Sequence, residues 1–286
     1  MRTASPLRYP GGKTVLYPLV SSLINENDLD CPSYAEPYAG GAGLALELLF
    51  NGVVSDIHIN DIDIAVWSFW QSVLTDSEKL IELVHNAVFT VAEWRRQKSI
   101  FADGEASVLE KGFAFFYLNR TNRSGIIHKA GLIGGLKQNG NYKMDCRFNK
   151  LSLINKIRLI SKYGHKIKLY NLDALDFMTL VDDYENDVFV YADPPYYNKG
   201  ASLYTSFYNH SDHASVADKL KDLTKPWMLT YDNTPEIKSL YGSCRQEYFN
   251  LNYSLQTKRK GQEVLVLSDC LRAPRSVLAS NISLVA

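Results

Sequence analysis

Short apolar runs alternate with amphipathic segments along most of the chain. Residues 188–192 (VFVYA) and 227–231 (WMLTY) are continuous runs rich in β-branched and aromatic residues, a pattern typical of strands covered on both faces. Residues 213–223, between these runs, have the apolar spacing of a helix. The same reading predicts a short strand and turn at 33–40 and strands at 57–63, 167–171 and 261–269. Because strands and helices alternate, the pattern predicts an α/β fold.

The middle of the chain interrupts this alternation. From residue 64 to about residue 118, apolar side chains recur at spacings of three and four, which predicts helices. Asn139-Gly140 then suits a tight hairpin turn, and residues 149–164 predict a basic amphipathic helix. The expected domains are a discontinuous catalytic domain of residues 1–63 and 165–286 and an inserted domain of residues 64–164.

Composition places the chain among ordinary globular proteins. Its 286 residues are 46% hydrophobic and 22% charged, and no run of about 18 apolar residues indicates a membrane span. The four cysteines are scattered without a Cys-x-x-Cys pair, so we expect neither a disulfide framework nor a structural zinc site. We expect a cytoplasmic protein that contacts no membrane and requires no metal.

The net charge of zero hides an asymmetry. Residues 119–168 contain twelve Lys or Arg and one acid, Asp145, which makes this stretch about +11 by simple subtraction. A basic, glycine-containing stretch of this kind is typical of a segment that binds a polyanion. Mixed charge that serves only solubility is the alternative.

Two glycine-rich stretches are candidates for binding a nucleotide. Residues 7–14 lack the first glycine of a P-loop, because Leu7 stands in its place, and no strand precedes them. Residues 36–46 (EPYAGGAGLAL) follow a predicted strand and open a helix, as a nucleotide-binding loop does. About twenty residues later Asp61 ends the next strand, where an acid binds ribose hydroxyls. This order indicates a cofactor that contains adenosine, with a nicotinamide dinucleotide still possible.

The run at 188–192 ends abruptly in Asp193-Pro194-Pro195-Tyr196. Proline cannot continue a strand ladder, so the Asp193 carboxylate and the Pro194 carbonyl stand at the carboxyl end of the predicted strand, where ligands bind in such sheets. Both groups can accept hydrogen bonds from an exocyclic amine, and the Tyr196 ring can stack on a splayed nucleobase. A rigid turn without function is the alternative.

These motifs together resemble the α-class (D12) N6-adenine-specific DNA methyltransferases, the Dam-like family. RYPGGK, EPYAGGAG, INDID, FFYLNRTNRSG, ALDFM and ADPPYY match the family's motifs in order over nearly the whole chain. The resemblance implies a Rossmann-like S-adenosylmethionine-dependent methyltransferase sheet with an inserted helical, basic DNA-recognition domain. It departs from the family at Tyr38, which replaces Phe, and at Ala42 in the third position of the loop.

The resemblance also implies a role for individual residues. The catalytic residues would be Asp193, Pro194, Pro195 and Tyr196. The S-adenosylmethionine site would contain Tyr9, Lys13, Pro37, Tyr38, Gly40, Gly41, Asp61, Asp176, Phe177 and Asp193, with Asp61 on the ribose and residues 176–177 on the cofactor's adenine. The implied reaction moves a methyl group to N6 of an adenine flipped out of duplex DNA.

Double-stranded DNA is the expected partner, bound by a monomer or a weak dimer. Candidate DNA-binding residues are Asn119, Arg120, Thr121, Asn122, Arg123, Lys129, Lys137, Lys258, Arg259 and Lys260. Arg and Asn give bidentate readout of guanine and adenine, but an arginine can equally bind a phosphate. Affinity should therefore fall steeply with salt.

Three other functions remain open. A methyltransferase acting on cytosine N4 or on RNA would use the same chemistry, although Asp rather than Ser before Pro-Pro-Tyr favours adenine. A non-catalytic DNA-binding protein on the same fold would have lost Asp193 or Tyr196, and both are present. A nicotinamide oxidoreductase would not require the basic insert.

Overall fold

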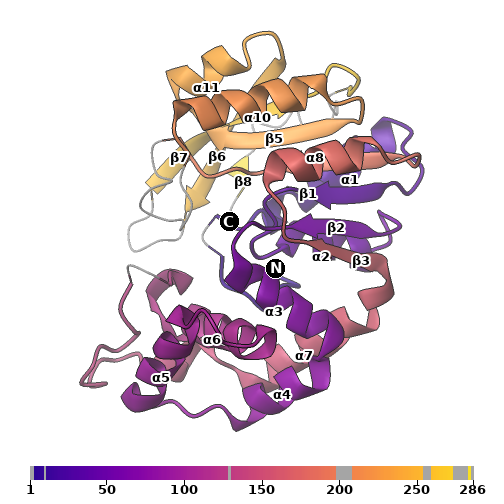
Figure 1. Cartoon of the computed structure of the whole chain (residues 1–286). Coiled ribbons are helices and arrows are strands. Elements are labelled where there is room, and N and C mark those ends of the chain that lie inside the picture. The colour runs from indigo at the N-terminus through magenta and orange to yellow at the C-terminus, as the bar shows by residue number, and fades with distance from the viewer. Residues whose placement is uncertain are drawn as a thin grey trace.

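A mixed sheet of eight strands forms the centre of the described chain (Figure 1), in the order β3-β2-β1-β4-β5-β7-β6-β8. This computed structural model describes residues 3–9, 11–127, 130–197, 208–253, 259–272 and 283–284. The strands are β1 (Ser33–Glu36), β2 (Ile57–Asn60), β3 (Ile167–Tyr170), β4 (Val188–Ala192), β5 (Trp227–Asp232), β6 (Arg245–Tyr253), β7 (Arg259–Leu267) and β8 (Ser283–Leu284).

The chain winds in two directions from the middle of this sheet. Strands β1 to β5 are parallel, and β1 pairs with β2 on one side and with β4 on the other. Strand β7 lies antiparallel between β5 and β6. The strand order therefore reverses between β1 and β4, the point where ligands bind in open α/β sheets. The predicted α/β, Rossmann-like fold is confirmed.

Alternate residues of the central strands pack on opposite faces of the sheet. Tyr34 and Phe189 belong to one hydrophobic cluster, together with α1 (Tyr17–Glu26) and α2 (Gly43–Phe50). Ala35 belongs to a second cluster on the other face. That face is covered by α8 (Ala174–Asp182), α10 (His210–Asp222) and α11 (Pro235–Leu240), which lie together at the top of Figure 1. Covering both faces explains why the strands read as continuous apolar runs.

Helices occupy most of the chain between β2 and β3, and Figure 1 shows them gathered below the sheet. They are α3 (Ile64–Thr75), α4 (Ser77–Asn86), α5 (Val91–Ala102), α6 (Val108–Thr121) and α7 (Lys150–Lys162), with the short 3-10 turns η2 (Arg123–Gly125), η3 (Met144–Arg147) and η4 (Gly164–Lys166). Side chains of Asp63, Thr90, Ser107 and Asn149 cap α3, α5, α6 and α7. These caps satisfy amide groups that the first turn of a helix leaves without partners.

Helices α3 and α6 approach each other closely at Gly112. A Cβ atom built on Gly112 would lie 2.6 Å from the Ser68 carbonyl oxygen, so only glycine fits at this crossing. Next to it, the rings of Phe69 and Phe116 stack with their centroids 5.1 Å apart. Phe69 and Leu44 of α2 belong to the same hydrophobic cluster, so the helices between β2 and β3 share a core with one face of the sheet.

The hairpin expected around Asn139-Gly140 is not present. Among the described residues of this segment, the strand pairing is a single bridge between Asn122 and Leu132, and residues 133–138 form turns. The Gln138 side chain donates to the Ile133 carbonyl at 2.8 Å and accepts from the Met144 amide at 3.0 Å. A side-chain amide thus closes this loop in place of a strand ladder.

No helix among the described residues is long and apolar enough to cross a membrane.

Candidate active site

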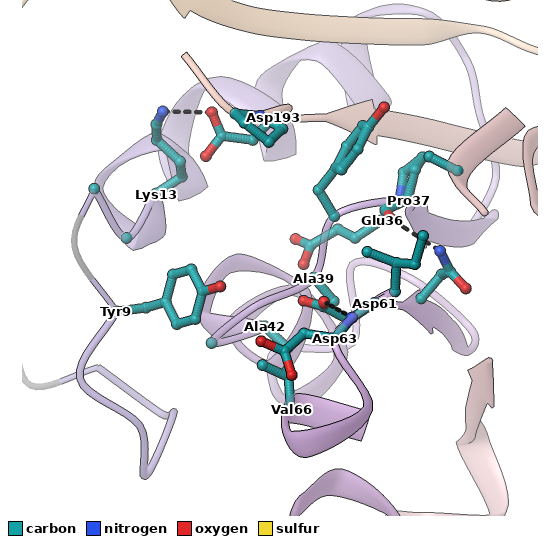
Figure 2. Close-up of a pocket in the computed structure, with 18 of the residues that line it drawn as sticks. Tyr9, Lys13, Glu36, Pro37, Ala39, Ala42, Asp61, Asp63, Val66 and Asp193 are labelled. Carbon is teal, nitrogen blue, oxygen red and sulfur yellow. Dashed lines mark hydrogen bonds and ion pairs between the residues drawn. The ribbon is translucent and has the colours of Figure 1, made fainter. Parts of the chain in front are cut away.

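A pocket lies at the point where the strand order reverses, beside the carboxyl ends of β1, β2 and β4 (Figure 2). Three further parts of the chain contribute to its wall: the N-terminal segment, helix α6 with the turn that follows it, and the start of α8. Of the predicted site residues, the pocket is lined by Tyr9, Lys13, Pro37, Tyr38, Gly41, Asp61, Asn119, Asp193 and Pro195. Residues far apart in the sequence, from both predicted motifs, therefore meet in one pocket.

Contacts with Asp61, Trp70 and Tyr9 hold the glycine loop after β1 in place. Gly40 has a φ of +46°, and a Cβ built there would lie 2.6 Å from the Tyr9 ring. The Gly40 amide donates to Asp61 Oδ2 at 2.9 Å. On the other side, Trp70 Nε1 of α3 donates to the Gly40 carbonyl at 2.9 Å. Only glycine combines this left-handed backbone with such close approach of an aromatic ring.

Asp61 orders both the loop and the start of α3. Its Oδ1 accepts a hydrogen bond from the Asp63 amide at 2.9 Å, while its Oδ2 accepts one from the Gly40 amide. Burial raises the pKa of Asp61 to about 7, although the hydrogen bonds from the Asp63 and Gly40 amides oppose the rise. A carboxylate offers about four acceptor positions, so Asp61 can still accept from hydroxyl groups of a ligand in the pocket.

Lys13 is the centre of a buried polar cluster at the other end of the pocket. Its ammonium lies 2.7 Å from Asp193 Oδ1, and Figure 2 shows this contact across the top of the pocket. It also lies 3.1 Å from the Tyr196 hydroxyl and 3.3 Å from Glu263 Oε2. Thr230 of β5 donates to the same Asp193 oxygen at 3.0 Å. The cluster thus joins the N-terminal segment, the Asp-Pro-Pro-Tyr motif and the two strands β5 and β7.

The charges of this cluster shift the protonation of its members. Burial disfavours the charged form of Lys13, but Asp193, Tyr196 and Glu263 outweigh it, so the pKa of Lys13 lies well above its usual value. Burial raises the pKa of Asp193, and the charge of Glu263 adds to the rise while Lys13 opposes it. Lys13 therefore remains an ammonium ion, and it lies beside two acids, the half-buried Asp193 and the buried Glu263.

Two acids of this site were not among the predicted residues. Glu36, the last residue of β1, is only 4% exposed, lines the pocket and accepts a hydrogen bond from Tyr34 at 2.9 Å. Burial raises the pKa of Glu36 to about 8, although the Tyr34 hydroxyl opposes the rise. Glu36 could have been found, because it directly precedes the glycine loop at a strand end. Glu263 lies within a predicted strand, where the sequence contains no signal for a polar partner.

Some predicted residues lie away from the pocket wall. Phe177 is fully buried in the hydrophobic cluster on the other face of the sheet, next to the Tyr170 ring. Asp176 is exposed, and Ala174 is the residue of α8 that lines the pocket. Pro194 is buried and Tyr196 is 6% exposed. Contact of residues 176–177 with the cofactor's adenine remains a prediction.

Most polar side chains of residues 119–122 point inward. Asn119 is 1% exposed, accepts from the Arg8 amide at 2.8 Å and donates to the carbonyls of Arg8 and Gly125. Asn122 accepts from Trp94 Nε1 at 2.8 Å and donates to the Ile126 carbonyl at 2.9 Å. Thr121 donates to the Tyr117 carbonyl within α6. In this conformation these three side chains hold the backbone and do not face outward toward a base.

Three arginines gather beside this segment. Burial, Arg8 and Arg147 lower the pKa of Arg120 to about 10, and burial and Arg147 lower the pKa of Arg8. Arg120 Nε is buried without a hydrogen-bond partner among the described residues. No carboxylate forms an ion pair with Arg8, Arg120 or Arg147 in the part of the chain that the structure describes. We call this group the arginine cluster.

The other predicted DNA-binding residues are exposed or lie outside the described chain. Arg123 and Lys137 are exposed. Arg259 and Lys260 are the first two residues of β7, whereas Lys129 and Lys258 lie outside the described residues.

Among the residues that the structure describes, no three His, Cys, Asp or Glu side chains form a group that could hold a metal ion.

Similarity to known proteins spans both halves of the pocket. The family model of the D12 class N6 adenine-specific DNA methyltransferases matches residues 9–258. The type II methyltransferase M1.LlaDCHI of Lactococcus lactis subsp. cremoris is 25% identical over 269 residues, which cover 89% of this chain and 88% of that protein. The matched region includes Tyr9, the glycine loop, Asp61 and Asp193.

Two solved structures resemble the chain more distantly. One is a candidate RNA methyltransferase, PH1948, from Pyrococcus horikoshii, with 12% identity and a TM-score of 0.43 over 92% of this chain and 85% of that one. The other is the rRNA methyltransferase aviRa from Streptomyces viridochromogenes, with 14% identity and a TM-score of 0.37 over 84% of this chain and 76% of that one. Similarity at this level does not bear on the substrate.

Proposed function

This chain belongs to the D12 class of N6 adenine-specific DNA methyltransferases, and on that premise we propose that it uses S-adenosylmethionine to methylate an adenine flipped out of duplex DNA. As a member of this family it is a transferase, with DNA as substrate and a methyl donor as cosubstrate. The observation that carries the proposal is the single pocket that both Asp61 and Asp193 line. Since N6 is paired inside a duplex, the base must leave the stack to enter such a pocket.

The residues at the Asp61 end of the pocket fit a cationic, adenosine-containing cofactor. Asp61 can accept from ribose hydroxyls, and the preformed glycine loop allows a ligand to approach the backbone closely. Glu36 is a buried acid on the pocket wall, and after loss of its proton it can pair with a cation such as the methionine ammonium. When bound, S-adenosylmethionine supplies a methyl group on a positively charged sulfonium.

The residues at the Asp193 end fit the target amine. Lys13 and Thr230 both donate to Oδ1 of Asp193, and a carboxylate has further acceptor positions. Asp193 and the Pro194 carbonyl would accept from the two N6 hydrogens and turn the nitrogen lone pair toward the methyl group. Such alignment of two reactants contributes roughly 7–11 kcal/mol in favourable systems.

The buried acids also suit the movement of charge during transfer. The reaction moves a positive charge from sulfur to N6, and one proton must then leave the methylated amine. Asp193 and Glu263 lie near this path with Lys13 as a counter-charge, and Glu36 can join them once it has lost its proton. Preorganised charges in a site that excludes water stabilise such a transition state without reorganisation.

The arginine cluster and the basic stretch supply the proposed surface for the DNA backbone. The three arginines have no carboxylate partner in the described part of the chain and repel one another, and a phosphate would relieve that repulsion. Exposed Arg123 is placed to read a base or a phosphate. We propose that one copy of the chain, or a weak dimer, binds duplex DNA in this way.

The test is transfer of labelled methyl groups from S-adenosylmethionine to unmethylated duplex DNA, followed by digestion to nucleosides. We expect label in N6-methyladenosine with the wild-type protein and with Glu185→Ala, an exposed control, but not with Asp193→Ala. Label in cytosine would replace the proposed base while keeping the chemistry. DNA binding without label on any nucleoside would overturn the proposal.

We also propose that the enzyme methylates one fixed DNA sequence, as part of a restriction–modification system. The type II description of the Lactococcus relative supports this, together with family membership. Sequencing of modified bases in DNA from cells that express the chain should show one fully methylated motif. Methylation scattered over many sequence contexts would contradict site specificity.

A further inference from the structure

Glu263 is a buried acid in the middle of the sheet. It lies in β7 opposite Asp232 of β5 and is 1% exposed. Directly opposed residues of an antiparallel pair share a face of the sheet. Glu263 therefore lies on the same face as Thr230, which donates to Asp193. The same face of β7 continues with Leu265 and Leu267, which are buried apolar residues. For packing alone, an apolar residue at position 263 would therefore suffice.

Glu263 contacts Tyr196 through a hydrogen bond at one oxygen and Lys13 through an ion pair at the other. Oε1 accepts a short hydrogen bond from the Tyr196 hydroxyl. Oε2 lies 3.3 Å from the Lys13 ammonium, which itself lies 3.1 Å from the Tyr196 hydroxyl. The three side chains thus form a closed triangle, and Lys13 extends it to Asp193 at 2.7 Å.

This triangle is costly for folding alone. A second carboxylate next to one ammonium leaves the buried cluster with a net negative charge, and burial of charge is commonly neutral or unfavourable relative to apolar packing. The cost is explained if the arrangement serves the reaction. The triangle fixes the hydroxyl end of Tyr196, whose ring is the proposed stacking surface, and it fixes the ammonium that holds Asp193.

We propose that Glu263 is a positioning residue, which holds Tyr196 directly and Asp193 through Lys13 in the arrangement that receives the target adenine. The inference rests on the methyl transfer to adenine proposed above. Glu263 touches neither the base nor the cofactor in this scheme. Its effect reaches the reaction through the orientation of two groups that do touch the base.

The first test compares Glu263→Gln with the wild-type protein and with Glu247→Gln, a matched control on β6 outside the cluster. Gln keeps the shape and can still accept from Tyr196, but it removes the negative charge opposite Lys13. We expect single-turnover methylation to slow on the order of 100-fold, the effect of a small misplacement of reacting groups. The dissociation constants for S-adenosylmethionine and for duplex DNA should stay within about threefold of the wild-type values, because neither ligand is proposed to contact Glu263.

A pH profile separates this role from packing. The charged and titratable groups around Asp193 are Lys13, Tyr34, Glu36, Tyr191, Tyr196, Tyr231 and Glu263. The negative charge of Glu263 raises the pKa of Asp193, so its removal should move the acid limb of the single-turnover rate to lower pH. A loss of packing alone would leave the position of that limb unchanged.

A second variant guards against failure of Glu263→Gln to fold. Tyr196→Phe keeps the ring and removes only the hydroxyl that Glu263 and Lys13 hold. We expect Tyr196→Phe to slow transfer as well, and to weaken the fluorescence rise of 2-aminopurine at the target position when the base flips. Combined with Glu263→Gln, its effect should be less than additive, because both changes break the same triangle.

The outcomes separate the inference from the function on which it rests. A wild-type protein that labels no adenine overturns the function. A wild-type protein that labels adenine, with Glu263→Gln matching it in rate and pH profile, overturns the positioning role alone. Unchanged rate and flipping in Tyr196→Phe would also overturn the positioning role.

Discussion

The strand ends and the segment after α6 both carry dense polar side chains, but they use them in opposite ways. In the first region, Lys13 of the N-terminal segment joins Asp193, which follows β4, to Glu263 within β7. In the segment at 119–125, Asn119 and Asn122 turn inward and bond to the backbone. The first arrangement keeps acceptors and charges available to a ligand, whereas the second fixes the path of a loop. Residue type alone did not distinguish the two.

The largest effect should come from the strand ends. Asp193→Asn keeps the shape of the side chain but presents an amide that can donate toward the target amine. We expect the methylation rate to fall roughly 10²- to 10³-fold, the size of losing one preorganised electrostatic contact, while affinity for S-adenosylmethionine changes little. Single-turnover rates and calorimetric titration of the cofactor measure the two. A rate close to wild type would mean that Asp193 does not hold the amine.

The next effect should come from the loop, and should appear as stability. Asn119→Ala removes the partners of the Arg8 amide and of the Arg8 and Gly125 carbonyls. We expect about 2–3 kcal/mol lower free energy of unfolding, because buried polar groups lose their hydrogen bonds. Urea unfolding measures it, with exposed Asn155→Ala on α7 as the control. Unchanged stability with relaxed sequence preference would instead make Asn119 a base-reading residue.

A smaller effect concerns Glu36 and pH. Because burial raises the pKa of Glu36 to about 8, its protonated form predominates below that pH, and binding of a cation requires loss of the proton. Affinity for S-adenosylmethionine should rise by up to about tenfold per pH unit up to about pH 8 and then level off. Because the ordinary pKa of Glu36 is 4.5, the stability that its neutral form gives the protein should fall progressively from about pH 4.5 to about pH 8. Glu36→Gln should flatten both dependences in titrations and thermal melts.

The smallest effect should come from the arginine cluster. Arg120→Ala should weaken DNA binding about equally for all sequences and reduce the slope of log affinity against log salt by about one. Stability should not fall, because the change relieves repulsion from Arg8 and Arg147. Fluorescence anisotropy at several salt concentrations measures the slope, with exposed Arg95→Ala on α5 as the control. A loss of affinity confined to one DNA sequence would assign Arg120 to a base.

The sequence predicted the features that depend on short stretches of chain. Apolar runs located the strands, and the acids and glycines that follow β1, β2 and β4 located the pocket, because the carboxyl ends of parallel strands meet at one edge.

The features that the sequence did not reveal depend on contacts between distant residues. Glu263 lies 250 positions from Lys13 and sits in a run of strand-forming residues, so no local pattern marks it. The inward turn of Asn119 depends on Arg8, 111 residues away. The expected hairpin was wrong because the Gln138 side chain, rather than a pair of strands, closes that loop.

The tight crossing at Gly112 limits how this enzyme can be given a new target sequence. Gly112 places α6 against α3, and Trp70 of α3 holds the glycine loop through the Gly40 carbonyl. Under the proposed function, exchange of residues 64–164 with those of a relative should therefore disturb the proposed methyl-donor site along with the choice of DNA sequence. A chimaera that retains both helices and exchanges only residues 123–147 leaves that contact intact. The part of the chain that can be exchanged to change the target DNA sequence is thus smaller than residues 64–164.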